Sequence, residues 1–207
     1  MLTNILLVIA AYLLGAVPFG LVVSKLFQGI DIREHGSGNI GATNVMRKMG
    51  TRFALFVLFL DTAKGALIIC LAIQLNVGTP VMLLAGLMVI LGHCFPVFLR
   101  FKGGKGVATS LGVLLFIPGF ALPMLFVLIV FVVIVALTKY VSLGSIVASL
   151  MVPLSFIMLS VYRSETFSYH HIIFGIALAF LLLYCHRENI FRLLSGKESK
   201  IKEKKSS

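Results

Sequence analysis

Long apolar runs separated by short polar segments dominate this chain of 207 residues. A run of about 20 apolar residues can cross the roughly 30 Å hydrocarbon layer of a bilayer as a helix. The pattern therefore predicts an all-α polytopic membrane protein. The clearest predicted spans cover residues 1–24, 53–74, 81–99, 142–162 and 168–185.

The apolar run over residues 106–138 is too long for one span, because a straight helix of that length would reach roughly 50 Å. Pro118 and Gly119 interrupt the run, and both residues disfavour a continuous helix. We therefore predict a short fourth span over residues 106–117 and a full fifth span over residues 120–138. The loop before the short span is expected to dip into the membrane, sheltered by protein or water.

The basic residues favour seven spans, with the N-terminus outside and the C-terminus in the cytoplasm. In this topology every Lys and Arg except Lys64 and Arg163 lies on the inner side, as the positive-inside rule expects. Fusing the fourth and fifth spans would place Lys139 in lipid or outside. We predict one seven-helix membrane domain over residues 1–198, followed by a basic, flexible cytoplasmic tail over residues 199–207.

Composition narrows the class of protein further. With 59% hydrophobic and 12% charged residues, the chain is too apolar for a soluble domain. The topology explains most of the net charge of +11, so we expect no nucleic-acid partner. The cysteines Cys70, Cys94 and Cys185 lie singly in apolar segments, which is typical of small buried residues rather than a disulfide framework or zinc site. No metal and no cofactor are predicted.

A glycine-rich polar loop over residues 36–47 lies on the predicted inner face. Its glycines can expose N–H groups, Ser37, Thr43 and Asn44 add short polar groups, and Arg47 can hold an oxyanion through two hydrogen bonds. The loop matches the G-x-G-x-x-G pattern, but a membrane span precedes it instead of a strand, so dinucleotide binding is not expected. A hairpin capped by Ser and Asn side chains is the structural alternative.

Two further polar segments lie on the same face. Residues 101–109 read FKGGKGVAT, so three glycines and two lysines precede a helix start, an arrangement that suits an anion. In residues 186–198, helical spacing places His186 and Asn189 on one face, although this segment also fits an amphipathic anchor. Together these loops could hold two phosphate groups near each other.

Asp61 and Lys64 are the charged residues inside a predicted span, where they are costly unless they face partners. Either they tie helices together or they help to position a phosphate. His93 is expected to be a packing histidine. Ser142 begins the sixth span, where it can cap the helix or reach a phosphate.

The three inner segments, SGNIGATNVMR (residues 37–47), FKGGKGVAT and HRENIFRLLSGKE (residues 186–198), resemble the signature blocks of the bacterial acyl-phosphate:glycerol-3-phosphate acyltransferase family. The resemblance implies transfer of a fatty acyl group from acyl phosphate to the 1-hydroxyl of sn-glycerol 3-phosphate, which gives lysophosphatidic acid and phosphate. It also implies a multi-pass protein of the bacterial inner membrane whose active site faces the cytoplasm, and coupling to the enzyme that makes acyl phosphate.

We assign roles to the matching residues as a hypothesis. The predicted ligands of the donor phosphate are Ser37, Gly38, Asn39, Gly41, Thr43, Asn44, Gly103, Gly104 and Gly106. The predicted ligands of glycerol 3-phosphate are Arg47, Lys102, Lys105, Ser142, His186 and Asn189. The predicted catalytic residues are Ser37, Arg47, Lys105, His186 and Asn189, supported by Asp61, Lys64 and Glu198. The base stays open between His186 and a substrate phosphate oxygen, and Ser37 as a covalent acyl carrier is a third option.

The main alternative is a transporter of organic phosphate or another anion, suggested by the intramembrane Asp61 and Lys64 and by the anion-binding loops. Against it, the glycine-rich basic loops all lie on one predicted face. A membrane scaffold with a basic tail attracted to anionic lipid is a third interpretation.

Overall fold

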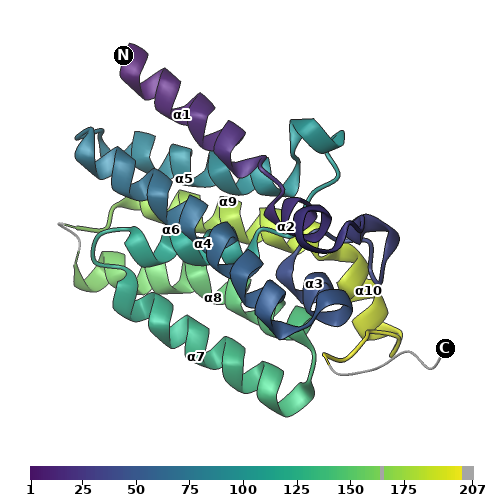
Figure 1. Ribbon diagram of the computed structural model, residues 1–207. Coiled ribbons are helices and arrows are strands. Elements are labelled where there is room, and N and C mark those ends of the chain that lie inside the picture. The colour runs from purple at the N-terminus through teal and green to yellow at the C-terminus, as the bar shows by residue number, and fades with distance from the viewer. Residues whose placement is uncertain (164–165, 202–207) are drawn as a thin grey trace.

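The computed structural model describes residues 1–163 and 166–201, and every regular element within them is helical. The helices form a bundle with the N-terminus at one end and α3 and α10 at the other (Figure 1). The elements are α1 (Leu2–Gly15), α2 (Phe19–Gln28), η1 (Ile32–Glu34), α3 (Ala42–Met49), α4 (Thr51–Gln74), α5 (Thr79–Cys94), η2 (Val97–Leu99), α6 (Val107–Phe116), α7 (Ala121–Thr138), α8 (Val141–Tyr162), α9 (Tyr169–Cys185) and α10 (Arg187–Leu194), where η marks a 3-10 helix.

The helical lengths agree with a membrane protein. Within the described residues, four stretches are long and apolar enough to cross a bilayer, and their bounds lie close to the predicted ones. Two bent pairs, α1 with α2 and α9 with α10, raise the number to six when each pair counts as one span. The four long stretches are Thr51–Gln74, Thr79–Leu99, Ala121–Thr138 and Val141–Tyr162.

The first span is not the continuous helix that we predicted over residues 1–24. The chain bends by 42° between α1 and α2, and α2 packs against α3 and α4. Pro18 explains the bend, because its ring removes a backbone N–H group and disfavours a helical conformation at Val17. Lys25, the first residue after the predicted span, lies within α2.

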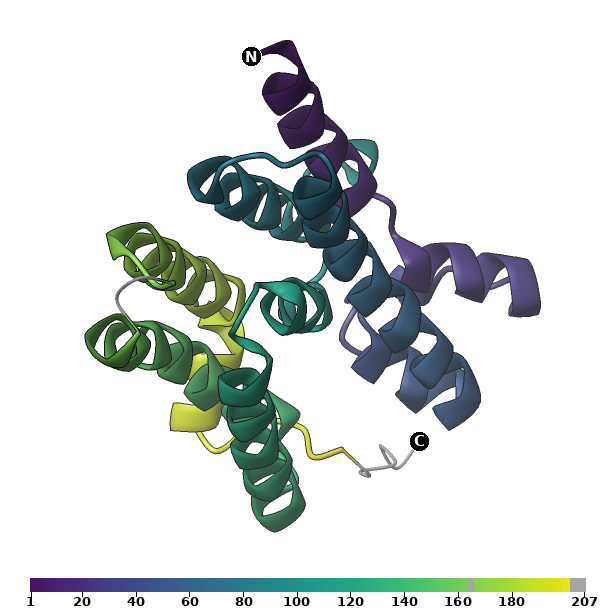
Figure 2. The same ribbon diagram turned by 90° about the vertical axis from the view of Figure 1, so that its left-hand side faces the viewer.

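A short helix, by contrast, does lie where the fourth span was predicted. α6 ends immediately before Ile117 and Pro118 and lies in the middle of the bundle, packed against α4, α5 and α7 (Figure 2). A Cβ atom on Gly112 would collide with the carbonyl oxygen of Thr62 in α4, and one on Gly65 with that of Thr109. Glycine at both positions therefore lets the α4 and α6 backbones touch, a common packing mode of membrane helices.

The remaining helices enclose α6. α1 packs on α5, where glycine again permits backbone contact at Gly15 and Gly92. α8 and α9 pack together, α7 packs on α8, and α9 also contacts α5. The side chains between these helices form one continuous hydrophobic core, and a second, smaller cluster lies beneath α2, η1 and α3.

Buried polar groups stabilise the break in the first span. Lys64 Nζ donates to the carbonyl oxygens of Gly15 (3.0 Å) and Val17 (3.2 Å), which the break leaves without helical partners. The same nitrogen lies 2.8 Å from Asp61 Oδ1 and 2.9 Å from His93 Nδ1. An unpaired carbonyl is costly in hydrocarbon, so Asp61 and Lys64 tie helices together here, and His93 is part of the same cluster.

The cluster of Lys64, Asp61 and His93 predicts that the substitution Lys64→Met lowers the stability of the protein. The substitution leaves the Asp61 carboxylate and two backbone carbonyls without their donor, and breaking a buried ion pair typically costs about 3–5 kcal/mol. We expect a clear fall in the thermal unfolding temperature of the protein in detergent micelles. Lys48→Met, at an exposed position of α3, is the matched control, expected to change stability by less than about 0.5 kcal/mol. Equal losses in the two variants would contradict the assignment.

Candidate active site

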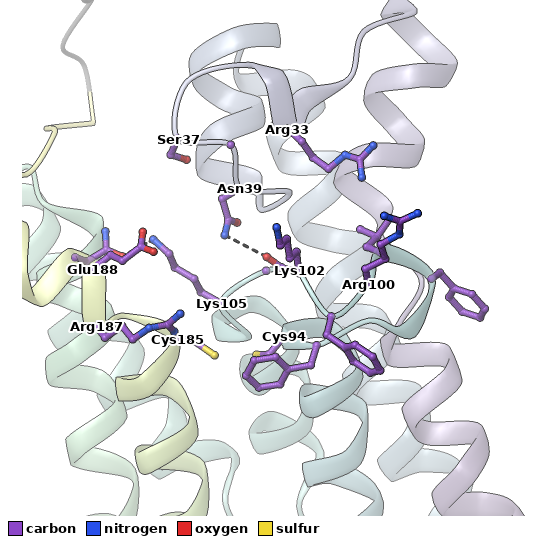
Figure 3. A pocket seen from close by; sticks show the side chains of 18 residues that line it. Arg33, Ser37, Asn39, Cys94, Arg100, Lys102, Lys105, Cys185, Arg187 and Glu188 are labelled. Atoms are coloured by element: carbon purple, nitrogen blue, oxygen red, sulfur yellow. Dashed lines mark hydrogen bonds between the residues drawn. The ribbon is translucent and has the colours of Figure 1, made fainter.

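A cavity of about 680 Å³ opens at the end of the bundle that carries α3 and α10. Its walls come from the loop between η1 and α3, from the connection between α5 and α6, and from the junction of α9 and α10 (Figure 3). The three segments that the sequence motifs singled out therefore meet in space. The predicted site residues that line the cavity are Ser37, Gly38, Asn39, Lys102, Gly103, Gly104, Lys105 and Asn189.

Asn44 holds the first loop in shape. Its side-chain oxygen accepts a hydrogen bond from the Ser37 N–H group (3.0 Å). Its amide nitrogen donates to the carbonyl oxygens of Ile32 (3.1 Å), His35 (2.9 Å) and Asn39 (2.9 Å). These contacts use both the oxygen and the nitrogen of the buried amide, so Asn44 positions the loop. The Ser37 side chain is exposed and lines the cavity.

The rest of the first motif lies beside the cavity instead of lining it. The Gly41 N–H group donates to Asn39 Oδ1 (2.8 Å) and precedes the first turn of α3, which contains Thr43. Arg47, at the other end of α3, is exposed and donates to the carbonyl oxygen of Ser199 (3.2 Å). These residues therefore shape the loop and the rim.

The α5–α6 connection reverses sharply before it reaches the cavity. Arg100 and Phe101 both have left-handed backbone angles, with φ of 52° and 61°, which is uncommon for residues other than glycine. The Gly104 N–H group then donates to the His93 carbonyl oxygen (2.9 Å), and a Cβ atom on Gly104 would collide with the His93 ring. Packing against His93 therefore requires glycine at this position.

Hydrogen bonds join the three segments to one another. Asn39 Nδ2 donates to the Gly103 carbonyl oxygen (3.4 Å), which links the first loop to the second (Figure 3). Lys105 Nζ donates to Asn189 Oδ1 (2.5 Å), which links the second loop to α10. Gly106, with φ of 81°, begins α6 and packs against Cys94 behind the cavity wall.

Glu198 organises the groups behind Lys105. Its Oε1 atom accepts hydrogen bonds from Asn189 Nδ2 (2.7 Å) and Ser142 Oγ (2.8 Å), and its Oε2 atom accepts one from Arg192 Nε (2.8 Å). Burial opposes ionisation of this carboxyl, but the three hydrogen bonds outweigh burial and lower the pKa of Glu198. A chain of contacts thus runs from Lys105 through Asn189 to a carboxylate.

Burial also lowers the pKa values of the two basic side chains nearest to these contacts, Lys105 and His186. It lowers the pKa of Lys105 to about 8, although the charge of Glu198 acts in the opposite direction. It lowers the pKa of His186 to about 4, although a hydrogen bond to Leu182 favours the charged form. The His186 Nδ1–H group donates to the Leu182 carbonyl oxygen (2.8 Å), so Nε2 keeps its lone pair. His186 is therefore a buried, neutral imidazole at neutral pH.

Three arginines that the motif analysis did not assign also line the cavity: Arg33, Arg100 and Arg187. Arg100 directly precedes the glycine motif of residues 101–109, and Arg187 belongs to the motif of residues 186–198. This proximity in sequence was the signal that could have identified them. Glu188 is the acidic side chain among the lining residues. The lining is therefore strongly cationic, which together with backbone N–H groups suits phosphate binding.

Part of the predicted tail is held against the bundle. The Ser199 carbonyl accepts the Arg47 hydrogen bond, and the Ile201 N–H group donates to the carbonyl oxygen of Lys139 between α7 and α8 (2.9 Å). Residues 202–207 of the predicted flexible tail lie outside the described residues. Up to Ile201, then, the chain crosses from α10 towards α3 and α8.

Comparison with known proteins agrees with the resemblance that the sequence motifs indicated. The glycerol-3-phosphate acyltransferase family model matches residues 5–196. Among curated relatives, a glycerol-3-phosphate acyltransferase of Desulforudis audaxviator is 46% identical over 205 residues, which are 99% of this chain and 98% of that protein. The protein of the same name from Bacillus subtilis is 43% identical over 199 residues, with 95% and 97% covered.

Solved structures with a similar fold are also glycerol 3-phosphate acyltransferases. The fold is similar to the crystal structure of PlsY (YgiH), an integral membrane glycerol 3-phosphate acyltransferase, in its glycerol 3-phosphate form, with a TM-score of 0.86 and 41% identity over 96% of this chain and 95% of that one. The lysophosphatidic acid form of PlsY gives a TM-score of 0.84 at the same identity and coverage. From the family match, the relatives and the shared fold, we conclude that this membrane-bound chain belongs to the glycerol-3-phosphate acyltransferase family.

Proposed function

We propose that this enzyme transfers a fatty acyl group from an acyl phosphate to the 1-hydroxyl of sn-glycerol 3-phosphate, and releases lysophosphatidic acid and inorganic phosphate. One observation carries the proposal: three glycine-rich or basic segments line a single cationic cavity at one end of an apolar bundle. The solved PlsY structures are its glycerol 3-phosphate form and its lysophosphatidic acid form, and these two molecules are the acceptor and the product of this reaction.

An acyl phosphate suits the site because it is an activated mixed anhydride. The protein then needs to hold two phosphorylated molecules together and to stabilise the negative charge that develops on the departing phosphate. N–H groups and fixed cations perform both tasks. The acyl chain can stay in the lipid while its phosphate occupies the cavity.

The proposed topology has seven spans with the N-terminus outside the cell. The bent pair α1–α2 forms the first span, α6 the short fourth and α9 the seventh, so the cavity opens to the cytoplasm. The basic residues of the cavity and of α3 and α10 support this orientation in a bacterial inner membrane. An opening on that side also suits delivery of the donor by the enzyme that makes acyl phosphate.

Within the cavity, we assign the donor phosphate to the first loop and to the glycines of the α5–α6 connection. Lys105 and Asn189 hold glycerol 3-phosphate, with Lys102 beside them and with Arg47, Ser142 and His186 supporting the rim and the back wall. The glycine and asparagine residues behind the loops, which keep the N–H groups in place, are Gly41, Asn44 and Gly106. The donor ligands are Ser37, Gly38, Asn39, Gly103 and Gly104.

In the reaction itself, the 1-hydroxyl oxygen of glycerol 3-phosphate attacks the acyl carbonyl carbon, and the bond between that carbon and the phosphate oxygen breaks. His186 is a weak base because burial holds its pKa at about 4. We therefore assign the hydroxyl proton to a substrate phosphate oxygen, and give His186 the role of accepting a hydrogen bond through Nε2. The positive charge of Lys105 stabilises the leaving phosphate.

The donor assignment is tested with purified protein in detergent micelles. We expect phosphate release only when a fatty acyl phosphate and glycerol 3-phosphate are both present, with lysophosphatidic acid formed in equal amount. A long-chain acyl-CoA should give no product. A transporter or a scaffold would release no phosphate, and equal turnover with acyl-CoA would contradict the proposed donor.

Direct transfer makes a separate prediction about Ser37. When the protein is mixed with acyl phosphate alone, mass spectrometry should find no acyl ester on this residue, because the acyl group passes directly to the acceptor hydroxyl. The matched sample contains both substrates and shows that the preparation is active. An acylated Ser37 in the donor-only sample would establish a covalent intermediate instead.

The Lys105 pKa of about 8 predicts how activity depends on pH. Below pH 8 the protonated amine binds the anionic acceptor, and above it the charge is lost, so kcat/KM for glycerol 3-phosphate should fall by about tenfold per pH unit. Lys105→Arg should move this fall to higher pH, because a guanidinium stays charged. Lys102→Arg, a control at the exposed side of the cavity, should leave the fall in place. An unchanged profile for Lys105→Arg would contradict the role of Lys105.

A further inference from the structure

Two of the cysteines, Cys94 and Cys185, lie side by side in the wall of the cavity. Cys94 ends α5 and Cys185 ends α9, two helices that pack against each other. Both residues line the cavity, and their thiols are close enough to interact with each other. Figure 3 shows the two sulfur atoms pointing towards one another. Residues that the sequence presented as isolated are therefore a thiol pair.

The surroundings of the pair favour reaction with an oxidant. Both thiols are free, Cys94 is buried and Cys185 is partly exposed. The positive charges of Arg187 and Lys105 act on the Cys185 sulfur. Cationic neighbours favour the thiolate, which is the form that attacks peroxides. Cys70, in α4, is absent from the cavity lining and provides an internal comparison.

We propose that Cys94 and Cys185 form a modification site for peroxides, and that their oxidation to a disulfide switches off acyl transfer. The Cys185 thiol releases its proton, the thiolate attacks a peroxide oxygen, and the O–O bond breaks to give a sulfenic acid and hydroxide, which takes up the released proton as the first water. The Cys94 thiol then attacks the sulfenic sulfur, the S–S bond forms, and the hydroxyl leaves as a second water with the thiol proton. Hydrogen peroxide is reduced to two waters, and the two thiols lose two electrons. The effect on acyl transfer rests on the proposed function.

The position of the pair explains why a disulfide would stop transfer. Cys94 follows His93, whose carbonyl oxygen holds the Gly104 N–H group, and its Sγ atom lies 2.9 Å from where a Cβ atom on Gly106 would be. Cys185 precedes His186. Drawing the sulfurs to a bond length of about 2.05 Å therefore moves both the glycine segment and the imidazole. A misplacement of about 1 Å in an active site can cost roughly a hundredfold in rate.

The test treats the purified protein in detergent micelles with hydrogen peroxide. Differential alkylation and peptide mass spectrometry then measure which cysteines are linked. We expect a Cys94–Cys185 disulfide, a fall in acyl transfer of about tenfold to a hundredfold, and recovery of both thiols and activity after dithiothreitol. Absence of the linkage, or linkage with unchanged activity, would overturn the proposal.

Three variants, each compared with its own untreated activity, complete the test. Cys94→Ser and Cys185→Ser should lose the dithiothreitol-reversible inhibition, whereas Cys70→Ser should keep it. Equal reversible inhibition in Cys94→Ser would overturn the proposal. Because mass spectrometry reads the linkage without any assay, untreated protein that shows no acyl transfer would count against the proposed function alone, and the linkage would still decide whether the thiols form the site.

Discussion

The structure depends on how a helix ends inside a membrane. α1 stops at Gly15 within the bundle, and the carbonyl oxygens at the break have no water to donate hydrogen bonds to them. Lys64 supplies the donor, and Asp61 and His93 surround its charge. The break lets α2 turn towards the first loop, and the backbone of His93 also anchors the α5–α6 connection through Gly104. One buried cluster thus determines where two walls of the cavity lie.

The walls themselves show that residues which hold the scaffold together also line the cavity. Gly104 must be a glycine for the chain to pass the His93 ring, and the same lack of a side chain opens its surroundings to the cavity. Lys105 has Asn189 as its partner, while Asn189 is oriented by the Glu198 carboxylate. Such mutual hydrogen bonding holds the cavity in shape before any ligand arrives, which reduces the entropy lost on binding.

Much of this fold could be predicted from the sequence, because the bilayer demands long apolar runs and Pro118 visibly divides the longest one. The break at Pro18 was missed, since the run around it stays apolar and a break there is stable only with a donor from α4. The motifs located the cavity segments, and their glycines and basic residues indicated an anion. The Ser142–Glu198 contact and the Cys94–Cys185 pair were beyond reach, because they join residues that are distant along the chain. A pattern along one helix carries no information about such contacts.

The order in which the three cavity segments occur has a consequence for biosynthesis. The first loop and the α5–α6 connection are made early, but Asn189 and Glu198 belong to the last of the three segments. A ribosome must therefore translate past residue 198 before Lys105 meets Asn189 and the carboxylate behind it. A nascent chain can insert most of its helices while its cavity still lacks a wall, so the cavity is completed only after the third segment has been translated.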